Sequence, residues 1–448
     1  MKITNTIRSP FYALTIVAAS IVVFVYWQIN SYPESFSNIT FVFAYTIMLL
    51  FISIPLLISE NISGFLSKNT LTGSLHYVSR SQHLKFIGLL SKVIGALLLL
   101  LVSTRMLATS LNFFYTNISY ARHSVETELN SICSYTLTIS IIFSIIIIVI
   151  IGISQALKPF LKLTSAFSCL GIACLIGLFL INAISFNSSL TMKSFFTPEL
   201  KLLTSIDVWK SALKLSLFSS LVGLGINSVL GAYFNERCSI QRFSWTFIFS
   251  SICTVTVFML IKSIYKNNSH NTLEVISSQY NYTLNLLDFC MFFFCLLTTA
   301  VLLCQTFKDF SNANNTYKWY YHMPLFILLL TAMIVYQHVL TDKLRHIIQT
   351  ELITNLIFII TYFEILAFGW ICDAQNLCYQ IRKATKTKLS VLYNLSLRLI
   401  APSTILTFFT HQLLSKYFNP HWMSMMIIFI LSLILTVNIG NFLYRRFQ

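Results

Sequence analysis

Charged side chains are scarce in this chain of 448 residues, where they make up only 10% of the sequence. Hydrophobic residues reach 56%, and the mean hydropathy of +0.75 lies outside the range of soluble globular proteins. A soluble domain is lacking too, because the longest connection between apolar runs, about 186–207, has only about twenty residues. We therefore predict a single polytopic membrane domain over 1–448.

Acidic residues and catalytic motifs are also rare. Only 14 residues are Asp or Glu, and no P-loop, HExxH motif or nucleophile–base pair occurs, so we do not expect an enzyme. The ten cysteines lie in or beside apolar runs and form no CxxC motif. Structural disulfides, a zinc site and an organic cofactor are therefore not expected.

Apolar runs of membrane-spanning length recur along the whole chain and predict an all-α protein with twelve transmembrane helices. The first run lacks the small-residue cleavage site of a signal peptide, so we expect it to be a retained helix. The predicted spans are about 10–30, 39–60, 84–112, 132–153, 156–185, 208–234, 243–265, 283–306, 321–340, 352–378, 390–415 and 422–444.

The net charge of +16 is distributed in a way that indicates membrane topology. With the N-terminus inside, the cytoplasmic side carries seventeen of the thirty Lys and Arg residues, the outer side ten, and the spans three. This excess follows the positive-inside rule. It predicts a multi-pass protein of a bacterial inner (plasma) membrane with both termini cytoplasmic. The basic residues then contact lipid, and nucleic-acid binding is not expected.

Glycine is rare as well, with twelve in the chain, yet three of them lie in the stretch SLVGLGINSVLGAY of the sixth span. A glycine inside a helix costs about 1 kcal/mol relative to alanine. Gly223, Gly225 and Gly231 therefore predict either a break in the helix or a close helix–helix contact that needs small residues.

Polar residues inside the spans are the next informative feature, because charge is costly at membrane depth. Glu364 lies deep in apolar sequence and requires a buried partner or a water-filled cavity. Glu60 lies near the end of the second predicted span, so it is either buried or interfacial. Thr298 and Thr299 are adjacent in the eighth span and either bind a ligand or hydrogen-bond back to their own helix.

These features together resemble the neurotransmitter:sodium symporter family, whose bacterial members include sodium-dependent amino-acid transporters. The resemblance extends over nearly the whole chain and depends on the order and spacing of several motifs. They are Pro55, Glu60 and Gly64 in the second span, Gly152–Lys162 in the fifth, Ser205–Gly225 and Tyr233 around the sixth, Leu297–Thr299 in the eighth, Glu364 and Trp370 in the tenth, and Leu397–Pro402 in the eleventh.

The resemblance implies a fold of two inverted five-helix repeats, about 10–185 and 208–378, with two peripheral helices at about 390–444. The first and sixth helices of the family are broken at mid-membrane around a ligand cavity. Glu60 and Glu364 would then support the break by accepting hydrogen bonds from its backbone amides.

Two sets of functional positions follow from the resemblance. The predicted substrate positions, with Phe218 as an aromatic lid, are Ser20, Ile21, Phe24, Phe218, Ser219, Leu221, Gly223, Leu224 and Gly225. The resemblance also implies one possible sodium site, with ligands at Ala18, Ile21, Cys295, Thr298 and Thr299.

The first span departs from the family pattern. Val22 and Phe24 replace the two glycines of the break, and Val25 replaces an asparagine that helps to hold a second sodium ion. Ser251 and Val255 replace the other polar residues of that second ion site, which we expect to be lost. Because β-branched and aromatic residues disfavour an open turn, the first helix is either continuous or broken differently.

The outer gate and the third span also differ from the family. The charged pair of the gate is replaced by Gln28 and Gln349, which could hydrogen-bond as two amides. Arg105 lies in the third span, where the family has a substrate-closing tyrosine nearby. Arg105 either reaches water or pairs within the bundle without a function, or it receives a substrate carboxylate.

The leading hypothesis is a secondary transporter of amino acids or related small amines that works by alternating access, as a monomer or homodimer. Sodium is one possible coupling ion. Alternatively, Glu60, Glu364 or Asp373 takes a proton, or the protein exchanges solutes without an ion. A second hypothesis is a transporter-derived protein that binds a ligand or partner without transport. A continuous first helix that fills the cavity favours this second hypothesis.

Overall fold

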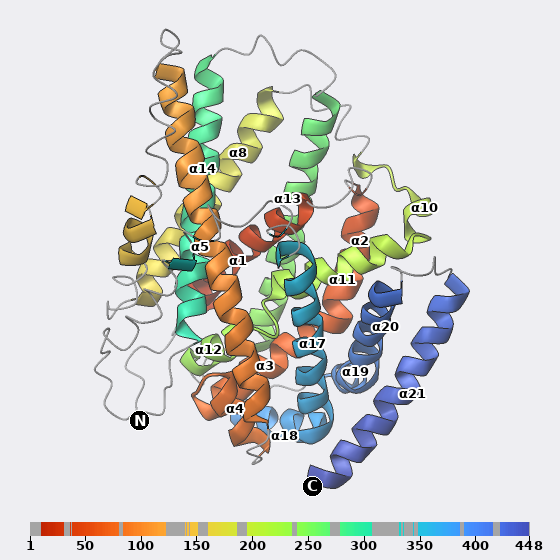
Figure 1. Ribbon diagram of the computed structural model, residues 1–448. Helices are drawn as coiled ribbons and strands as arrows, with labels where there is room; N and C mark the ends of the chain where they lie inside the picture. The colour runs from red at the N-terminus through yellow and green to blue at the C-terminus, as the bar shows by residue number, and fades with distance from the viewer. Residues whose placement is uncertain are drawn as a thin grey trace.

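The computed structural model describes residues 10–30, 36, 38–79, 84–121, 139, 141–142, 144–150, 160–185, 195–234, 240–268, 278–306, 331–332, 335, 344, 348–385, 389–414 and 422–447. Within these ranges every labelled element is a helix (Figure 1). Eight helical segments are long and apolar enough to cross a membrane, and a shorter apolar stretch covers Leu14–Tyr26. The chain is therefore an all-α, multi-pass membrane protein, as predicted.

Ten of the twelve predicted spans coincide with described helices. Eight are the membrane-spanning segments, and the other two are the first and sixth spans. The predicted spans 132–153 and 321–340 lie largely outside the described residues. The count of twelve is thus supported only approximately, whereas the all-helical class is confirmed.

The first span is the single helix α1 (Pro10–Asn30), with no interruption at the positions where the resemblance implies a break. It packs against α8 (Phe160–Ser185), α11 (Ile206–Ser220), α13 (Ile240–Asn268) and α14 (Ser278–Gln305). The implied break is therefore wrong for this helix. Val22 and Phe24 stand where the family has glycines, and such side chains disfavour an open turn. The helix is therefore regular, and it is buried on several sides.

The second span is longer than predicted and reaches Ser67. Three segments continue one another, α2 (Ile39–Met48), the π-helical turn η2 (Leu49–Ser53) and α3 (Ile54–Ser67). Pro55 is the second residue of α3, just after the π turn. A proline lacks the N–H of a regular helical hydrogen bond, so a local change of helix type fits this position. Glu60 consequently lies within α3, where it is fully buried in the bundle.

The sixth span is broken into α11 and α12 (Ile226–Tyr233), which are separated by the turn 221–225. Three residues of this turn have left-handed backbone conformations, with φ of 57° at Leu221, 80° at Gly223 and 70° at Gly225. Glycine adopts this region without a steric penalty, which explains why two of the few glycines lie here.

The remaining helices surround this centre. The long α5 (Lys85–Ala121) packs against α4 (Leu71–Ser79), α14 and α17 (Ile353–Leu366). At the edge of the bundle, α20 (Ala401–Leu414) packs against α21 (Trp422–Phe447) (Figure 1). The side chains of α21 are mostly exposed. The last two spans are therefore peripheral, as predicted. The shorter elements are α10 (Leu200–Leu203), η5 (Ile348–Leu352), η6 (Ala367–Ile371), α18 (Ala374–Thr385), α19 (Val391–Leu395) and η7 (Ser396–Ile400).

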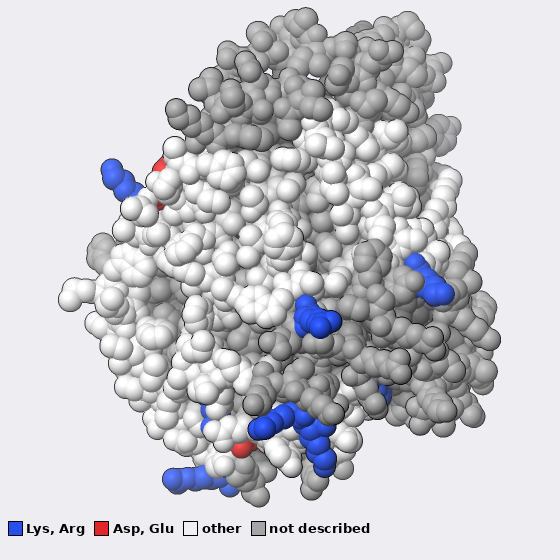
Figure 2. All heavy atoms as spheres, turned by 180° about the vertical axis from the view of Figure 1, so that it is seen from behind, with Lys and Arg blue, Asp and Glu red and all other residues white. Residues whose placement is uncertain are grey.

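The surface agrees with a membrane setting. Figure 2 shows one face of the molecule on which most described residues are uncharged, and several basic side chains gather toward its lower end. The same lower end carries α18 and the C-terminal end of α21 in Figure 1. Exposed basic residues there are Arg382, Lys383, Arg445 and Arg446.

Candidate functional site

The break in the sixth span is held by a buried carboxylate. The amide of Gly223 donates to Oε1 of Glu60 over 2.8 Å. The carboxyl group of Glu364, on α17, lies beside the same amide and beside the Glu60 carboxyl. Both acids are fully buried. A backbone amide exposed by a helix break has no water to meet in a membrane, so the Glu60 acceptor makes the break tolerable.

The glycines of the sixth span divide between the two roles that the sequence left open. Gly223 and Gly225 carry the positive φ values of the break. Gly231 instead allows close packing, because a Cβ there would collide with the backbone carbonyl of Asn61 on α3. Gly64 on α3 is its counterpart, since a Cβ there would collide with the carbonyl of Ser228 on α12. The two helices therefore cross in backbone contact.

Each of the two threonines that the resemblance assigns to sodium lies beside a serine hydroxyl of another helix. Thr299 Oγ1 lies 3.4 Å from Ser20 Oγ on α1, and Thr298 Oγ1 lies 3.4 Å from Ser168 Oγ on α8. Both threonines also donate back to their own helix, to Phe294 and Cys295 carbonyls. Both threonines therefore hydrogen-bond back to their own helix, which is one of the two predicted alternatives. Their hydroxyls also lie beside α1 and α8.

Only part of this arrangement fits a sodium ion. Hydroxyl oxygens are suitable hard ligands, and Thr298 and Thr299 are fully buried. Ala18 and Ile21, however, belong to the continuous helix α1, whose carbonyls take part in helical hydrogen bonds. Cys295 is buried, and its carbonyl accepts from Thr299 over 2.9 Å. Thr298 and Thr299 therefore offer hydroxyl oxygens, whereas Ala18 and Ile21 lie in an unbroken helix, and the sodium site stays a prediction.

The predicted substrate positions on α1, on α11 and in the turn 221–225 are buried and mostly apolar. The rings of Phe24 and Phe218 lie 6.0 Å apart at an interplanar angle of 42°, and both side chains are buried. Phe24 thus occupies space that a glycine would leave open. Leu221 and Leu224 are buried as well. A Cβ at Gly225 would point at Leu71 and Ser91, on α4 and α5.

A tyrosine that sequence reasoning missed joins this centre. The hydroxyl of Tyr45, on α2, lies 2.9 Å from Ser219 Oγ, and both residues are fully buried. Ser219 therefore has a protein partner on its hydroxyl. No motif marked Tyr45, because a single tyrosine in an apolar run is ordinary; its only signal was a polar tip that needs a partner at membrane depth.

The remaining predicted residues are Gln28, Gln349 and Arg105. Gln28 is buried on α1, and Gln349 lies in η5 with its side chain outside what the structure describes. The amide gate therefore stays a prediction. The side chain of Arg105 is exposed, whereas its neighbours Thr104 and Met106 are buried. Arg105 is consequently not part of the buried centre.

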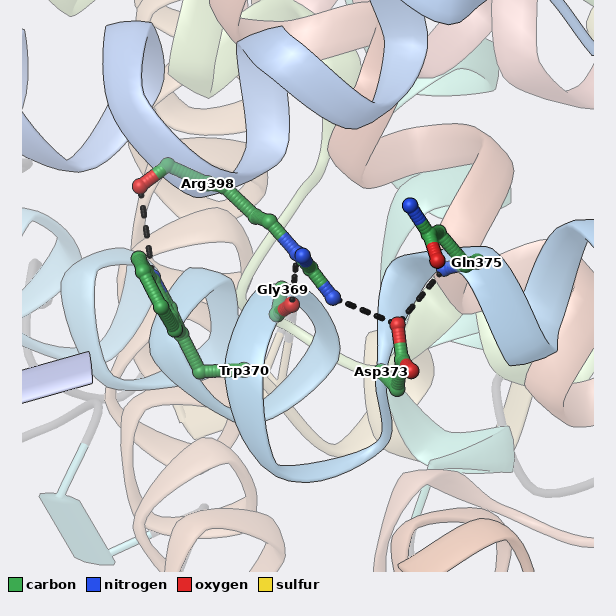
Figure 3. A network of polar contacts seen from close by, with 5 residues as sticks. All are labelled: Gly369, Trp370, Asp373, Gln375 and Arg398. Atoms are coloured by element: carbon green, nitrogen blue, oxygen red, sulfur yellow. Dashed lines mark hydrogen bonds and ion pairs between the residues drawn. The ribbon is translucent and has the colours of Figure 1, made fainter. Parts of the chain in front are cut away.

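A second polar network fixes the end of the tenth span (Figure 3). Arg398, in η7, bonds Asp373 over 2.5 Å and donates from Nε to the carbonyl of Gly369 over 3.0 Å. The indole of Trp370 returns a bond to the Arg398 carbonyl over 3.2 Å. Asp373 also accepts from the amide of Gln375 at the start of α18. The π-helical turns η6 and η7 are thereby joined.

Comparison with known proteins gives one kind of match. No family model and no curated protein matches the sequence. Among solved structures, the chain is similar to MhsT, a bacterial transporter of the neurotransmitter:sodium symporter family, in a crystal structure with L-phenylalanine. The TM-score is 0.67 at 15% identity, over 90% of this chain and 98% of MhsT. This likeness establishes the fold.

Proposed function

We propose that this protein is a secondary transporter of amino acids or related small amines that works by alternating access. The observation that carries the proposal is the buried break of the sixth span, with Glu60 on the amide of Gly223. A break at membrane depth is costly unless it serves a cavity or a movement. The transporter fold supplies the context in which such breaks are used.

The lining supports a substrate with an apolar or aromatic side chain. Phe24, Phe218, Leu221 and Leu224 are apolar, and aromatic rings favour offset or tilted contacts with another ring. The MhsT structure holds L-phenylalanine, which is consistent with this substrate class. Because Phe24 and Phe218 touch, entry of a substrate requires these two rings to separate.

We further propose that sodium couples to transport through the hydroxyls of Thr298, Thr299 and Ser20. The alternatives are coupling to a proton and exchange of solutes without an ion. Uptake measured under a sodium gradient and under a proton gradient distinguishes them. The basic end of the molecule, with Arg382 and Arg446, is proposed to face the cytoplasm of a bacterial inner membrane and to contact anionic lipid. Both termini would then be cytoplasmic, and the protein would act as a monomer or homodimer.

Uptake by the purified, reconstituted full-length protein tests the transport proposal. Radiolabelled amino acids and amines should accumulate in vesicles under a sodium or proton gradient, and Gly223→Ala should reduce the rate at least tenfold. Gly95→Ala is the matched control, because a Cβ at Gly95 finds its nearest neighbour, Thr306 Oγ1, at an ordinary 3.6 Å. Uptake of none of these solutes under either gradient would contradict the proposal.

One observation favours a second candidate, a membrane protein that binds a ligand or partner without transport. The first helix is continuous and places Phe24, fully buried, against Phe218. A Val22→Gly, Phe24→Gly variant separates the candidates. If the wild type is a transporter, the variant should retain uptake or bind substrate more tightly. If only the variant takes up solute, the second candidate is correct.

A further inference from the structure

Two lysines lie on the face of α11 that carries Phe218. One helical turn separates Lys210 from Lys214, and another separates Lys214 from Phe218. Side chains of a helix lean toward its N-terminus, so both ammonium groups lie on the N-terminal side of the contact between Phe218 and Phe24. Both lysines are partly buried. A ligand at this place would meet two cations on one side and two aromatic rings on the other.

The charge of the two lysines is only partly balanced. Lys210 interacts with Asp207, one turn earlier on the same helix. The charged group that acts on Lys214 is the other lysine. In the part of the chain that the structure describes, no acid pairs with Lys214. Like charges four residues apart on a helix repel each other. With Asp207 set against Lys210, one positive charge is left for an anion.

A second helix adds a buried histidine to the two lysines. His411, on α20, is 4% exposed and lies near Lys210 and Asp207. Its Nδ1 has no hydrogen-bond partner among the described residues, although buried polar atoms normally have one. Trp422, the first residue of α21, donates to the carbonyl of Thr204 just before α11. This bond holds the segment that follows α20 against the start of α11.

The predicted substrate positions offer little else to an anion. Helix α1 is continuous, so its amides are used within the helix. The side chains at these positions are uncharged, and the two acids at the break, Glu60 and Glu364, would not attract an anion. Arg105 is exposed and lies outside the buried centre. Lys214, one turn from Phe218, is therefore placed to receive a carboxylate.

We propose that Lys214 and Lys210, with His411, form a binding site for one carboxylate beside the contact between Phe24 and Phe218. The inference rests on the proposed transport function and narrows its substrates to amino acids, because two cations repel an amine that carries no acid. An ammonium group has three N–H donors and forms charge-assisted hydrogen bonds with carboxylate oxygens. The imidazole supplies a further nitrogen, and the aromatic rings receive the side chain of the amino acid.

The test compares amino acids with the amines that lack only the carboxylate, using the full-length protein in detergent. Equilibrium binding is measured for L-phenylalanine and phenethylamine, and for L-leucine and 3-methylbutylamine. We expect at least one of the two amino acids to bind at least about tenfold more tightly than its amine. Lys214→Gln should weaken binding of that amino acid at least about tenfold and leave binding of the amine unchanged, whereas Lys214→Arg, which keeps the charge, should retain most of the affinity. Lys201→Gln is the matched control, because Lys201 is exposed on α10, and it should bind like the wild type.

Thermal unfolding without ligand separates binding from folding. Because Lys214 is repelled by Lys210, Lys214→Gln should not lower the Tm of the ligand-free protein. A lower Tm with an equal loss of amine binding would assign Lys214 to the fold and overturn the site. The site is also overturned if the wild type binds none of the four compounds, if it binds each amine as tightly as its amino acid, or if Lys214→Gln binds the amino acids unchanged.

Uptake by reconstituted protein separates this inference from the proposed function. Amino-acid binding that depends on Lys214, in a protein without uptake, would support the site and contradict transport alone. Uptake by Lys214→Gln with the KM of the wild type would contradict the site and leave transport standing.

Discussion

Replacing Gly223 by alanine is the perturbation that most sharply probes the break of the sixth span. Gly223 has a φ of 80°, a left-handed conformation that costs an L-residue about 1–2 kcal/mol. The new Cβ would lie 3.0 Å from Ile360 Cγ2 and 3.2 Å from Thr361 Oγ1. Overpacking of this kind adds about 1–3 kcal/mol. Gly223→Ala should therefore destabilise the protein by roughly 2–5 kcal/mol.

The matched substitution, Gly95→Ala, makes the same chemical change inside α5. Its Cβ has room, and alanine in a helix interior is favoured over glycine by about 1 kcal/mol. Thermal unfolding of both variants in the same detergent should therefore separate them by at least about 5 °C in Tm, with Gly223→Ala the less stable. Equal Tm values would refute the reasoning, because they would mean that residue 223 does not occupy a left-handed turn.

Three further substitutions have expected outcomes. Glu60→Ala leaves the Gly223 amide without its acceptor and should lower the free energy of unfolding by about 1–3 kcal/mol. Glu60→Gln keeps an acceptor and should lower it less. Chemical unfolding of the two variants measures the difference. Gly64→Ala forces α3 away from the α12 backbone and should lower stability by about 1–3 kcal/mol, and an unchanged Tm would contradict the close crossing. Arg398→Lys loses the paired contact with Asp373 and the Gly369 carbonyl and should lower the free energy of unfolding by about 1 kcal/mol. The control Arg382→Lys, at an exposed position, should leave Tm almost unchanged.

Much of the fold follows from the sequence because the membrane imposes strong rules. Apolar runs marked ten spans that the structure describes as helices, and the cluster of rare glycines marked the break in the sixth span. Glu60 and Glu364 were identifiable because an acid at membrane depth needs a partner. Their placement at the amide of Gly223 is the part of the site that sequence reasoning anticipated most closely.

Other parts of the centre depend on tertiary packing that the sequence does not reveal. The loss of glycine at Val22 and Phe24 left two possibilities for the first helix, and only the structure shows it continuous. Tyr45 reaches Ser219 across two helices that lie far apart in the sequence. Single polar residues of this kind have no motif, since their partners are set by how the helices cross.

The network around Arg398 was hidden for the same reason. Asp373 and Arg398 belong to different spans, and although Arg398 lies within the Leu397–Pro402 motif, nothing in the sequence pairs it with Asp373. Their contact requires the π-helical turns η6 and η7 to face each other, which Gly369 permits, since a Cβ there would meet the Leu397 carbonyl at 2.9 Å. The network fixes the end of the tenth span that also carries Glu364.

The resulting picture is asymmetric. Within the fold, the sixth span has kept its break and two supporting acids, while the first span is a regular helix whose Phe24 fills the centre. Under the proposed transport function, we therefore expect ligand movement to involve the turn 221–225 and the contact between Phe24 and Phe218.

Hydrogen–deuterium exchange of backbone amides tests this asymmetry most directly. The amides of 20–26 lie inside a continuous helix and should be strongly protected, whereas those of 222–225, apart from the bonded amide of Gly223, should exchange much faster. Peptides covering the two segments of the same sample allow the comparison. Equal protection of both segments, or faster exchange in 20–26, would contradict an account in which only the sixth span is broken.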